Sequence, residues 1–318
     1  MTDRMPKFLV VGSGGVGGFF GGKVANAGND VWFLARGEHL RAMKERGLQI
    51  HSSEGSWIVP PGQITDTPVD AGIADVILFC VKSYDTEDVA RQIIPNVGEE
   101  TLIVSLQNGV DNEAKIKVLL PKGEVLGGVA FVYATITSPG VITETGGIKK
   151  LTFGSFDNSH RSVQGGKLLL KILQEAGVSA EYTPDITSAL WKKFIFITAI
   201  AGLTAMTRLT LGQILDVEPS RRLLIAAMTE AFNVAKARGA NLEKDFVEKT
   251  LGTVRGMKGD TYSSLFYDLT HGKPMEVEAL SGTILRYGRM LEIETPVHET
   301  IYASLLPHHL RHVAERKK

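Results

Sequence analysis

A glycine-rich stretch near the N-terminus has the spacing of a phosphate-binding turn. Residues 12–17 match the pattern G-x-G-x-x-G and directly follow the apolar run Phe8–Val11. Glycines here permit a tight turn and a close approach of the backbone to a pyrophosphate, which the start of the next helix attracts. An ordinary glycine turn is the alternative, but a strand before and a helix after favour a dinucleotide site. We expect the cofactor to contact Gly12, Ser13, Gly14, Gly15, Val16 and Gly17.

A basic residue stands where the second predicted strand ends. Arg36 comes two residues after the apolar run Val31–Leu34. Sites for NAD carry an acidic residue here that bonds the ribose 2′-hydroxyl, whereas a guanidinium group suits a 2′-phosphate. Arg36 could instead be a surface arginine without a ligand. The sequence favours NADP(H) as the cofactor.

Two more polar side chains follow apolar runs that read as strands. Lys82 comes directly after Val76–Val81. Asn108 follows Leu102–Leu106, with one residue, Gln107, between them. In open α/β sheets the carboxyl ends of the strands face the ligand crevice, so both side chains could touch cofactor or substrate. A solvated lysine and an Asn-Gly turn are the simpler alternatives.

A lysine in the second half of the chain could supply a proton. Transfer of hydride to a ketone leaves negative charge on the oxygen, so a donor must lie within hydrogen-bonding reach. Lys193, Ile197 and Ala201 share one stripe of a helix, at i, i+4 and i+8. If this stripe faces a cleft, desolvation lowers the pKa of Lys193 toward a useful range. Lys192 and Lys193 could also be a solvated pair.

Serine and acidic residues follow further along. Ser263, Ser264 and Asp268 lie at helical spacing, and Glu276 and Glu278 come next. A serine could bond a substrate carboxylate or hydroxyl, and a glutamate could hold the lysine or a ribose. Taken singly, such residues are usually surface residues.

The elements that would position these residues change character along the chain. The first half alternates short β-branched runs with helical stretches, which is typical of a doubly wound parallel sheet of the Rossmann type. The β-rich segment 125–154 should complete this sheet. From Thr183, where Thr183-Pro184 could cap a helix, the pattern is that of successive amphipathic helices, one opened by Pro219 and closed at Gly239. We expect a dinucleotide-binding domain over residues 1–182 and an all-α domain over residues 183–318.

Bulk properties exclude several classes of protein. The 318 residues carry 35 basic and 35 acidic side chains, and no basic stretch is longer than Arg316-Lys317-Lys318, so the sequence has no electrostatic footprint for nucleic acid. The one cysteine, Cys80, permits neither an internal disulfide nor a cysteine-based metal site, and we expect no metal. Residues 1–5 lack an apolar signal segment, and the longest weakly polar run, 194–206, is shorter than the roughly 20 residues that span a bilayer. These features predict a cytoplasmic protein with no membrane partner. Its helical domain could bury an apolar face in a homodimer.

Over nearly its whole length the chain resembles the ketopantoate reductase (2-dehydropantoate 2-reductase) family. The matching motifs, in family order, are Gly12–Gly17, Lys82, Asn108-Gly109, Trp191-Lys192-Lys193, Leu203-Thr204-Ala205, Ser263-Ser264 and Glu276. The resemblance implies NADPH-dependent reduction of a small keto acid, ketopantoate, to pantoate on the route to pantothenate and coenzyme A.

The resemblance also implies a role for each matched residue. Lys193 would be the general acid, and Glu276 would contact the cofactor and assist the lysine. Ser264 would bind the substrate carboxylate. The remaining contacts with NADPH and substrate would come from Arg36, Lys82 and Asn108.

The chain departs from the family pattern on the lysine's helical face. Ile197 and Ala201 replace two asparagines, Gly202 replaces a proline, and Thr261 replaces a further asparagine. The resemblance implies that those asparagines bind substrate, and polar sites discriminate more strongly than apolar ones. Two alternatives therefore stay open: a paralogue that reduces a more apolar 2-keto acid, and a module that senses NADPH without turnover.

Overall fold

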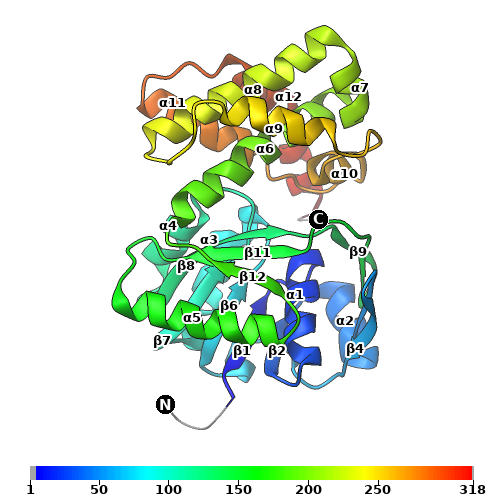
Figure 1. Ribbon diagram of the computed structural model, residues 1–318. Coiled ribbons are helices and arrows are strands. Elements are labelled where there is room, and N and C mark those ends of the chain that lie inside the picture. The colour runs from blue at the N-terminus through cyan, green and yellow to red at the C-terminus, as the bar shows by residue number, and fades with distance from the viewer. Residues whose placement is uncertain (1–4, 317–318) are drawn as a thin grey trace. The chain divides into compact units, whose positions relative to one another are not determined.

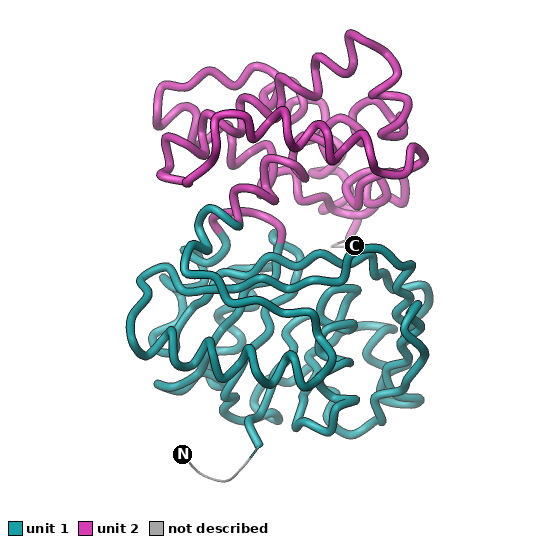
Figure 2. The backbone as a smooth tube through the Cα atoms, viewed as in Figure 1, with its two compact units in different colours: residues 1–107, 112–189 teal, residues 108–111, 190–318 magenta. Residues whose placement is uncertain are grey.

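The computed structural model describes residues 5–316, and the chain divides into two compact units (Figures 1 and 2). Unit 1 contains residues 1–107 and 112–189, and unit 2 contains residues 108–111 and 190–318. The division falls inside a helix, seven residues beyond the predicted domain boundary at residue 182. Residues 1–4, on which the expectation about a signal segment largely depends, lie outside the described part of the chain.

A parallel sheet forms the centre of unit 1, as the sequence predicts. The strands of its middle are β1 (Lys7–Val11), β2 (Asp30–Leu34), β6 (Ala74–Phe79) and β7 (Val97–Ser105), in the order β7-β6-β1-β2. Phe8 and Val10 pack in one apolar cluster, while Leu9 and Val11 pack in another. Because side chains alternate along a strand, β1 is buried on both faces, as a doubly wound sheet requires.

The same sheet continues on both sides. The added strands are β8 (Glu124–Phe131), β11 (Lys150–Gly154) and β12 (Ser179–Tyr182) beyond β7, and β5 (Ile64–Thr65) beyond β2. β8 runs parallel to β7, whereas β11 is antiparallel to β8. The prediction that segment 125–154 completes this sheet is therefore correct for its two ends.

The middle of that segment belongs elsewhere. It folds into β9 (Ala134–Ser138) and β10 (Val141–Glu144), which join β3 (Leu48–Ser52) and β4 (Gly55–Val59) in a second sheet of order β4-β3-β10-β9. For these two strands the prediction is wrong. β10 pairs in parallel with β3, and such long-range pairing has no signal in the local sequence.

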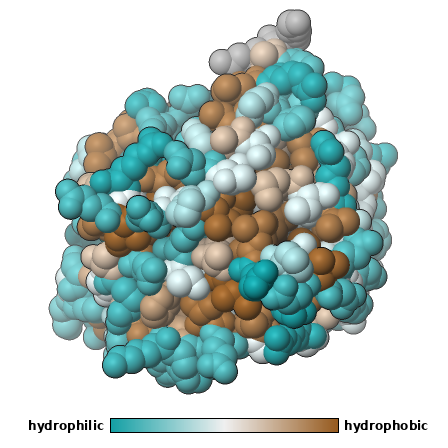
Figure 3. Space-filling model, turned by 90° about the horizontal axis from the view of Figure 1, so that it is seen from above, coloured by the Kyte–Doolittle hydropathy of each residue, from teal (hydrophilic) through white to brown (hydrophobic). Residues whose placement is uncertain are grey.

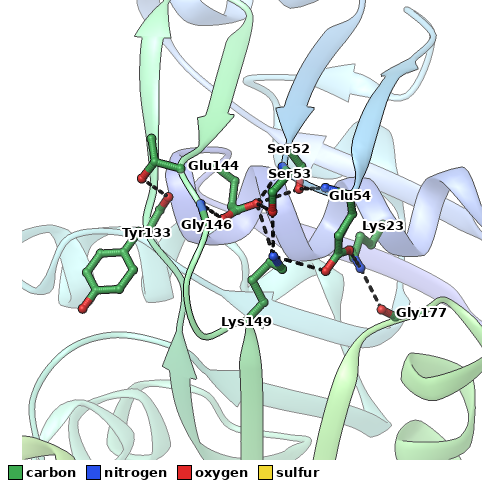
Figure 4. A network of polar contacts seen from close by, with 10 residues as sticks. Lys23, Ser52, Ser53, Glu54, Tyr133, Glu144, Gly146, Lys149 and Gly177 are labelled. Atoms are coloured by element: carbon green, nitrogen blue, oxygen red, sulfur yellow. Dashed lines mark hydrogen bonds and ion pairs between the residues drawn. The ribbon is translucent and has the colours of Figure 1, made fainter. Parts of the chain in front are cut away.

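A buried carboxylate, Glu144, links two parts of the second sheet through hydrogen bonds (Figure 4). Glu144, at the end of β10, accepts hydrogen bonds from the hydroxyl groups of Ser52 and Ser53 and from the Gly146 amide. Burial raises the pKa of this carboxyl, but the hydrogen bonds outweigh burial and bring the pKa to about 2. Glu144 therefore stays ionised and joins β10 to the turn between β3 and β4.

Helices cover the sheets of unit 1. They are α1 (Gly15–Asn26), α2 (Gly37–Arg46), α3 (Thr86–Gln92), α4 (Asn112–Leu119) and α5 (His160–Glu175), with short 3-10 turns η1 (Pro68–Ala71), η2 (Ser83–Asp85) and η3 (Ile94–Asn96). α1 contacts both sheets. The glycine motif therefore lies at the start of a helix that both sheets hold.

Unit 2 is helical, as predicted. It contains most of α6 (Ile186–Thr207), then α7 (Leu211–Asp216), α8 (Glu218–Ala237), α9 (Phe246–Arg255), α10 (Ser264–Thr270), the π-helix η4 (Glu278–Gly282), α11 (Thr283–Met290) and α12 (Pro296–Arg316). Pro219 lies in the first turn of α8, and Gly239 follows its end with φ of 85°. The predicted cap of α6 is wrong, because the carboxylate of Asp185, rather than Thr183, accepts the Ser188 amide at 3.0 Å.

Helix α6 is longer than the apolar run in the sequence suggests. It has 22 residues, and by length and composition alone it could cross a membrane, so the expectation that no segment is long enough is wrong. However, 67% of its most apolar window is buried inside the fold, where Phe194, Ile195 and Leu203 lie in the core of unit 2. This is the burial of a core helix and does not indicate a membrane protein. Figure 3 shows apolar side chains gathered toward the middle of one face of the molecule, with hydrophilic side chains mainly around them.

Candidate active site

In the glycine turn, Gly14 has open space beside it, whereas Gly15 and Gly17 are closely packed. A Cβ atom on Gly15 would lie 1.9 Å from the Ala134 carbonyl oxygen, and one on Gly17 would lie 2.2 Å from the oxygen of Gly12. Gly12 itself has φ of 95°, which favours glycine. A Cβ atom on Gly14 would meet nothing within 4 Å. Gly14 thus borders free space at the N-terminus of α1, and the turn fits the close approach of a dinucleotide.

The side chain of Ser13 stabilises the glycine turn and is not available to a cofactor. Its hydroxyl is buried and donates a hydrogen bond to the carbonyl oxygen of Leu34 at 2.9 Å. The side chain is thereby occupied, so only the backbone of Ser13 is available to a cofactor. The same bond joins the glycine turn to the end of β2.

A histidine that sequence reasoning missed supports this turn from the other side. His39 Nε2 lies 2.9 Å from the Ser13 carbonyl oxygen, and its Nδ1 lies 3.0 Å from the Gly140 amide nitrogen. The amide must donate and the carbonyl must accept, so the ring is the neutral tautomer with its proton on Nε2. Burial lowers the pKa of His39, although the bond to Ser13 opposes this. No local signal distinguishes His39 from an ordinary helix residue.

Arg36 lies at the carboxyl end of β2 and is open to solvent. Its side chain is 65% exposed and forms an ion pair with Asp85, N to O 2.5 Å. Asp85 ends the 3-10 turn η2, which Lys82 precedes directly. The exposed guanidinium is suited to bind an anionic group, and the ion pair connects the segment after β2 to the segment after β6.

The ends of β1, β6 and β7 also meet. The Cys80 amide donates to the carbonyl oxygen of Val11 at 2.7 Å. The Gln107 side-chain amide donates to the Val81 carbonyl at 2.9 Å and to the Thr86 hydroxyl at 2.7 Å. Gln107 is a second residue that sequence reasoning missed. These bonds hold the segments that follow β1, β6 and β7 together at the carboxyl end of the sheet.

In unit 2, Lys193 interacts with Glu276. Lys193 is half-buried on α6, and desolvation lowers its pKa to about 8, while the Glu276 carboxylate acts to raise it. Glu276 is itself only 6% exposed. An ammonium group of lowered pKa beside a buried carboxylate can release a proton near neutral pH, which is the property required of a general acid.

Two histidines of α12 hold the segment that carries Glu276. His309 Nδ1 accepts the Met275 amide at 3.0 Å, and His312 Nδ1 lies 2.9 Å from the Lys273 carbonyl oxygen. Both contacts span more than thirty residues, which is why the sequence gives no sign of them. The backbone on the N-terminal side of Glu276 is therefore fixed by the last helix.

The serine pair divides into a structural and a free member. The Ser263 hydroxyl caps α10 by accepting the Phe266 amide at 3.1 Å, and it lies 2.7 Å from the Thr204 hydroxyl of α6. Ser264 is exposed, and its hydroxyl makes no hydrogen bond within residues 5–316. Ser264, the residue expected to bind substrate, is thus the one whose hydroxyl is available.

The apolar departures from the family pattern lie on the lysine's stripe of α6. Ala201 is 5% exposed and Ile197 is half-buried. The oxygen of Ala201 lies 3.4 Å from the Ser263 hydroxyl, so this stripe meets the start of α10. On this stripe of α6, the side chains between Lys193 and the serine pair are therefore the hydrocarbon groups of Ile197 and Ala201.

Asn108 takes an unexpected place in the fold. It directly follows Gln107 of unit 1, but residues 108–111 belong to unit 2, as do Lys193, Ser264 and Glu276. Glu278, the glutamate that the sequence left unassigned, is exposed and forms an ion pair with Arg286. Glu276 is therefore buried beside Lys193, whereas Glu278 lies at the surface beside Arg286.

Comparison with known proteins supports one class. A family model described as ketopantoate reductase PanE/ApbA matches residues 8–158, and its C-terminal counterpart matches residues 185–308. The uncharacterized oxidoreductase YkpB of Bacillus subtilis is 32% identical and the alignment covers 94% of this chain and 97% of YkpB. The 2-dehydropantoate 2-reductase of Pyrococcus horikoshii is 28% identical, covering 93% and 95%.

A solved structure agrees over almost the whole fold. The PanE/ApbA family ketopantoate reductase from Ralstonia eutropha JMP134 is 30% identical, with a TM-score of 0.88, and the match covers 96% of this chain and 99% of that chain. A dinucleotide-binding sheet joined to a helical domain with a half-buried lysine defines an oxidoreductase that uses NAD(P)(H). The chain belongs to the ketopantoate reductase family.

Proposed function

We propose that this protein is a 2-dehydropantoate 2-reductase, which reduces ketopantoate to pantoate with NADPH and thereby serves the formation of pantothenate and coenzyme A. The observation that carries the proposal is the half-buried Lys193 with a pKa of about 8 beside the buried Glu276. This pair lies in a chain whose family is that of the ketopantoate reductases.

The glycine turn and the adjoining sheet edge would hold the cofactor. The backbone of residues 12–17 would face the pyrophosphate, with Gly14 providing the open side. Arg36 would bind the 2′-phosphate, and its exposure leaves the guanidinium accessible. Lys82 would add a second cation. When bound, NADPH supplies the hydride that the keto carbon accepts.

Lys193 would complete the reduction by giving a proton to the keto oxygen. When hydride adds to the keto carbon, the π electrons of the C=O bond move onto oxygen and leave it negatively charged. That oxygen then takes a proton from the ammonium group and becomes the hydroxyl of the product. The lowered pKa makes Lys193 a stronger acid than a solvated lysine, and Glu276 keeps it protonated at neutral pH. Ser264 and Asn108 would bind the substrate.

A specific observation favours a second candidate, a reductase of a more apolar 2-keto acid. Ile197 and Ala201 offer no hydrogen bond from their side chains on the stripe that carries Lys193. A substrate hydroxyl bound there would lose its hydrogen bonds to water without replacement, which costs about 1–3 kcal/mol. A hydrocarbon substituent would not incur this cost.

A panel of 2-keto acids tests the proposal. NADPH oxidation would be followed with ketopantoate and with branched and aromatic 2-keto acids that lack its hydroxyl. The highest kcat/KM with ketopantoate is expected, and a hydroxyl-free acid above ketopantoate would establish the second candidate instead. Binding of NADPH without turnover of any acid would point to a sensing module.

A cytoplasmic location and a homodimer remain predictions from the sequence. The groove along α8, where Ile225 and Ala226 lie between Arg222 and Glu230, offers an apolar strip for self-association. Light scattering on the purified full chain would give the oligomeric state.

A further inference from the structure

The segment that carries Asn108 is attached to the helical unit by two side chains. Residues 108–111 belong to unit 2, although residues 107 and 112 on either side belong to unit 1 (Figure 2). Val110 packs against the apolar core of unit 2, and Asp111 forms an ion pair with Arg286 of α11, O to N 3.1 Å. Gly109 has φ of 130°, a conformation that favours glycine, where the chain enters this segment.

Arg286 is held in place by other groups of unit 2. One nitrogen of its guanidinium, Nη1, lies 3.2 Å from the Glu278 carboxylate, and the other, Nη2, lies 2.8 Å from the Thr283 hydroxyl and also contacts Asp111. The Tyr302 hydroxyl of α12 donates to the other oxygen of Glu278. A planar guanidinium fork can bridge two carboxylates, which a lysine ammonium cannot do with the same fixed geometry. Glu278 and Tyr302 therefore orient the cation that Asp111 meets.

The π-helix η4 and its last residue, Gly282, leave space for the side chains of this network. Gly282 ends η4, and a Cβ atom there would lie 2.8 Å from the Glu278 carboxylate, 3.1 Å from the Tyr302 ring and 3.3 Å from Arg286. Single π turns occur often at functional sites. Here the turn and its glycine allow the carboxylate, the ring and the guanidinium to come together.

We propose that Arg286 is a positioning residue that, through Asp111, fixes the Asn108 segment to the unit that carries Lys193 and Glu276. The segment is short, so holding Asp111 limits the movement of Asn108 three residues away. Glu278 and Tyr302 act through Arg286. The inference rests on the proposed function in one respect: Asn108 contacts the substrate.

The Arg286→Met variant tests the proposal, with Arg289→Met as the matched control. Arg289 lies on the same helix and pairs with Glu299 at 3.5 Å on the surface. With NADPH saturating, Arg286→Met should raise KM for the keto acid about tenfold, equal to about 1.4 kcal/mol, while kcat changes much less. Asp111→Asn should give the same rise, and the double variant should add nothing to it. Arg289→Met should leave KM unchanged. Equal KM values for the Arg286 and Arg289 variants would overturn the proposal.

Amide hydrogen exchange of the full-length protein separates this inference from the proposed function. Peptides covering residues 108–112 should exchange faster in Arg286→Met than in the wild type or in Arg289→Met, with or without any turnover. If Arg286→Met fails to fold, Gly282→Ala serves, because its methyl group displaces the Glu278 carboxylate without removing a charge. Unchanged exchange in every folded variant would overturn the tether. Faster exchange combined with no keto acid turnover by the wild type would refute only the proposed function.

Discussion

Desolvation lowers the pKa of Lys193 and the Glu276 carboxylate partly offsets this effect, so that together they leave the pKa of the lysine at about 8. The two side chains come from distant parts of the sequence, Lys193 from α6 and Glu276 from the stretch before η4, and both belong to unit 2. The negative charge of Glu276 favours the protonated form of Lys193, whereas burial of the lysine disfavours it. The balance leaves an acid that is protonated at neutral pH and can still give up its proton.

The pH dependence of turnover follows from this balance. A general acid works only while it carries its proton, so kcat should be level below the pKa of Lys193 and should fall as the pH rises through about 8. In Glu276→Gln the negative charge is lost, the pKa of Lys193 falls, and the decline should move to lower pH. Profiles of kcat against pH for both proteins would check this, and an unshifted profile in the variant would disprove the coupling.

Two neighbouring glycines should respond differently to alanine. Gly14→Ala should leave the melting temperature unchanged, because its methyl group meets nothing, but should weaken NADPH binding by occupying the space that the cofactor needs. Gly15→Ala should destabilise the fold by about 1–3 kcal/mol, because its methyl group collides with Ala134. Thermal unfolding and NADPH titration would separate the two effects. Tight NADPH binding by a folded Gly14→Ala protein would contradict the position of the pyrophosphate.

Arg36 should set the preference for the phosphorylated cofactor. Loss of a charged hydrogen bond costs about 1.5–3 kcal/mol, and since the side chain is 65% exposed we expect the lower end. Arg36→Ala should therefore raise KM for NADPH roughly tenfold and change KM for NADH little. Arg41→Ala, on the exposed side of α2, is the control. An equal loss with both cofactors would exclude a contact with the 2′-phosphate.

The asparagines missing from α6 can be restored. Ile197→Asn and Ala201→Asn, singly and together, place amide groups on the stripe that carries Lys193. If apolar side chains limit recognition of the ketopantoate hydroxyl, the double variant should raise kcat/KM for ketopantoate relative to a hydroxyl-free keto acid. Two hydrogen bonds correspond to about 1–3 kcal/mol of discrimination. A ratio that stays the same would show that this stripe does not contact the substrate.

Much of the fold could be predicted because its signals are local. The apolar runs of β1, β2, β6 and β7 mark buried strands, and the glycine spacing marks the turn that follows β1. Lys193, Ile197 and Ala201 share a face simply because a helix repeats every 3.6 residues. Pro219 and Gly239 also mark the ends of α8, because proline suits the first turn of a helix and glycine suits a positive φ just beyond its end.

The remainder depends on contacts between distant residues. The local sequences of β9 and β10 do not distinguish them from the strands of the first sheet, and only the pairing of β10 with β3 assigns them to the second sheet. Thr183 and Asp185 are both good caps, so the local sequence could not decide between them. His39 and His309 are bonded to amides more than thirty residues away, and the tether of Asp111 to Arg286 spans 175 residues. No local pattern encodes such partners.

The role of Lys193 is tested most directly by its removal. We predict that Lys193→Ala lowers kcat with the preferred keto acid by at least about 100-fold, the lower end for general acid catalysis, and leaves the affinity for NADPH nearly unchanged. Lys192→Ala, at the adjacent exposed position, should retain wild-type kcat. A folded Lys193→Ala enzyme with kcat close to that of Lys192→Ala would contradict the assignment of the proton donor.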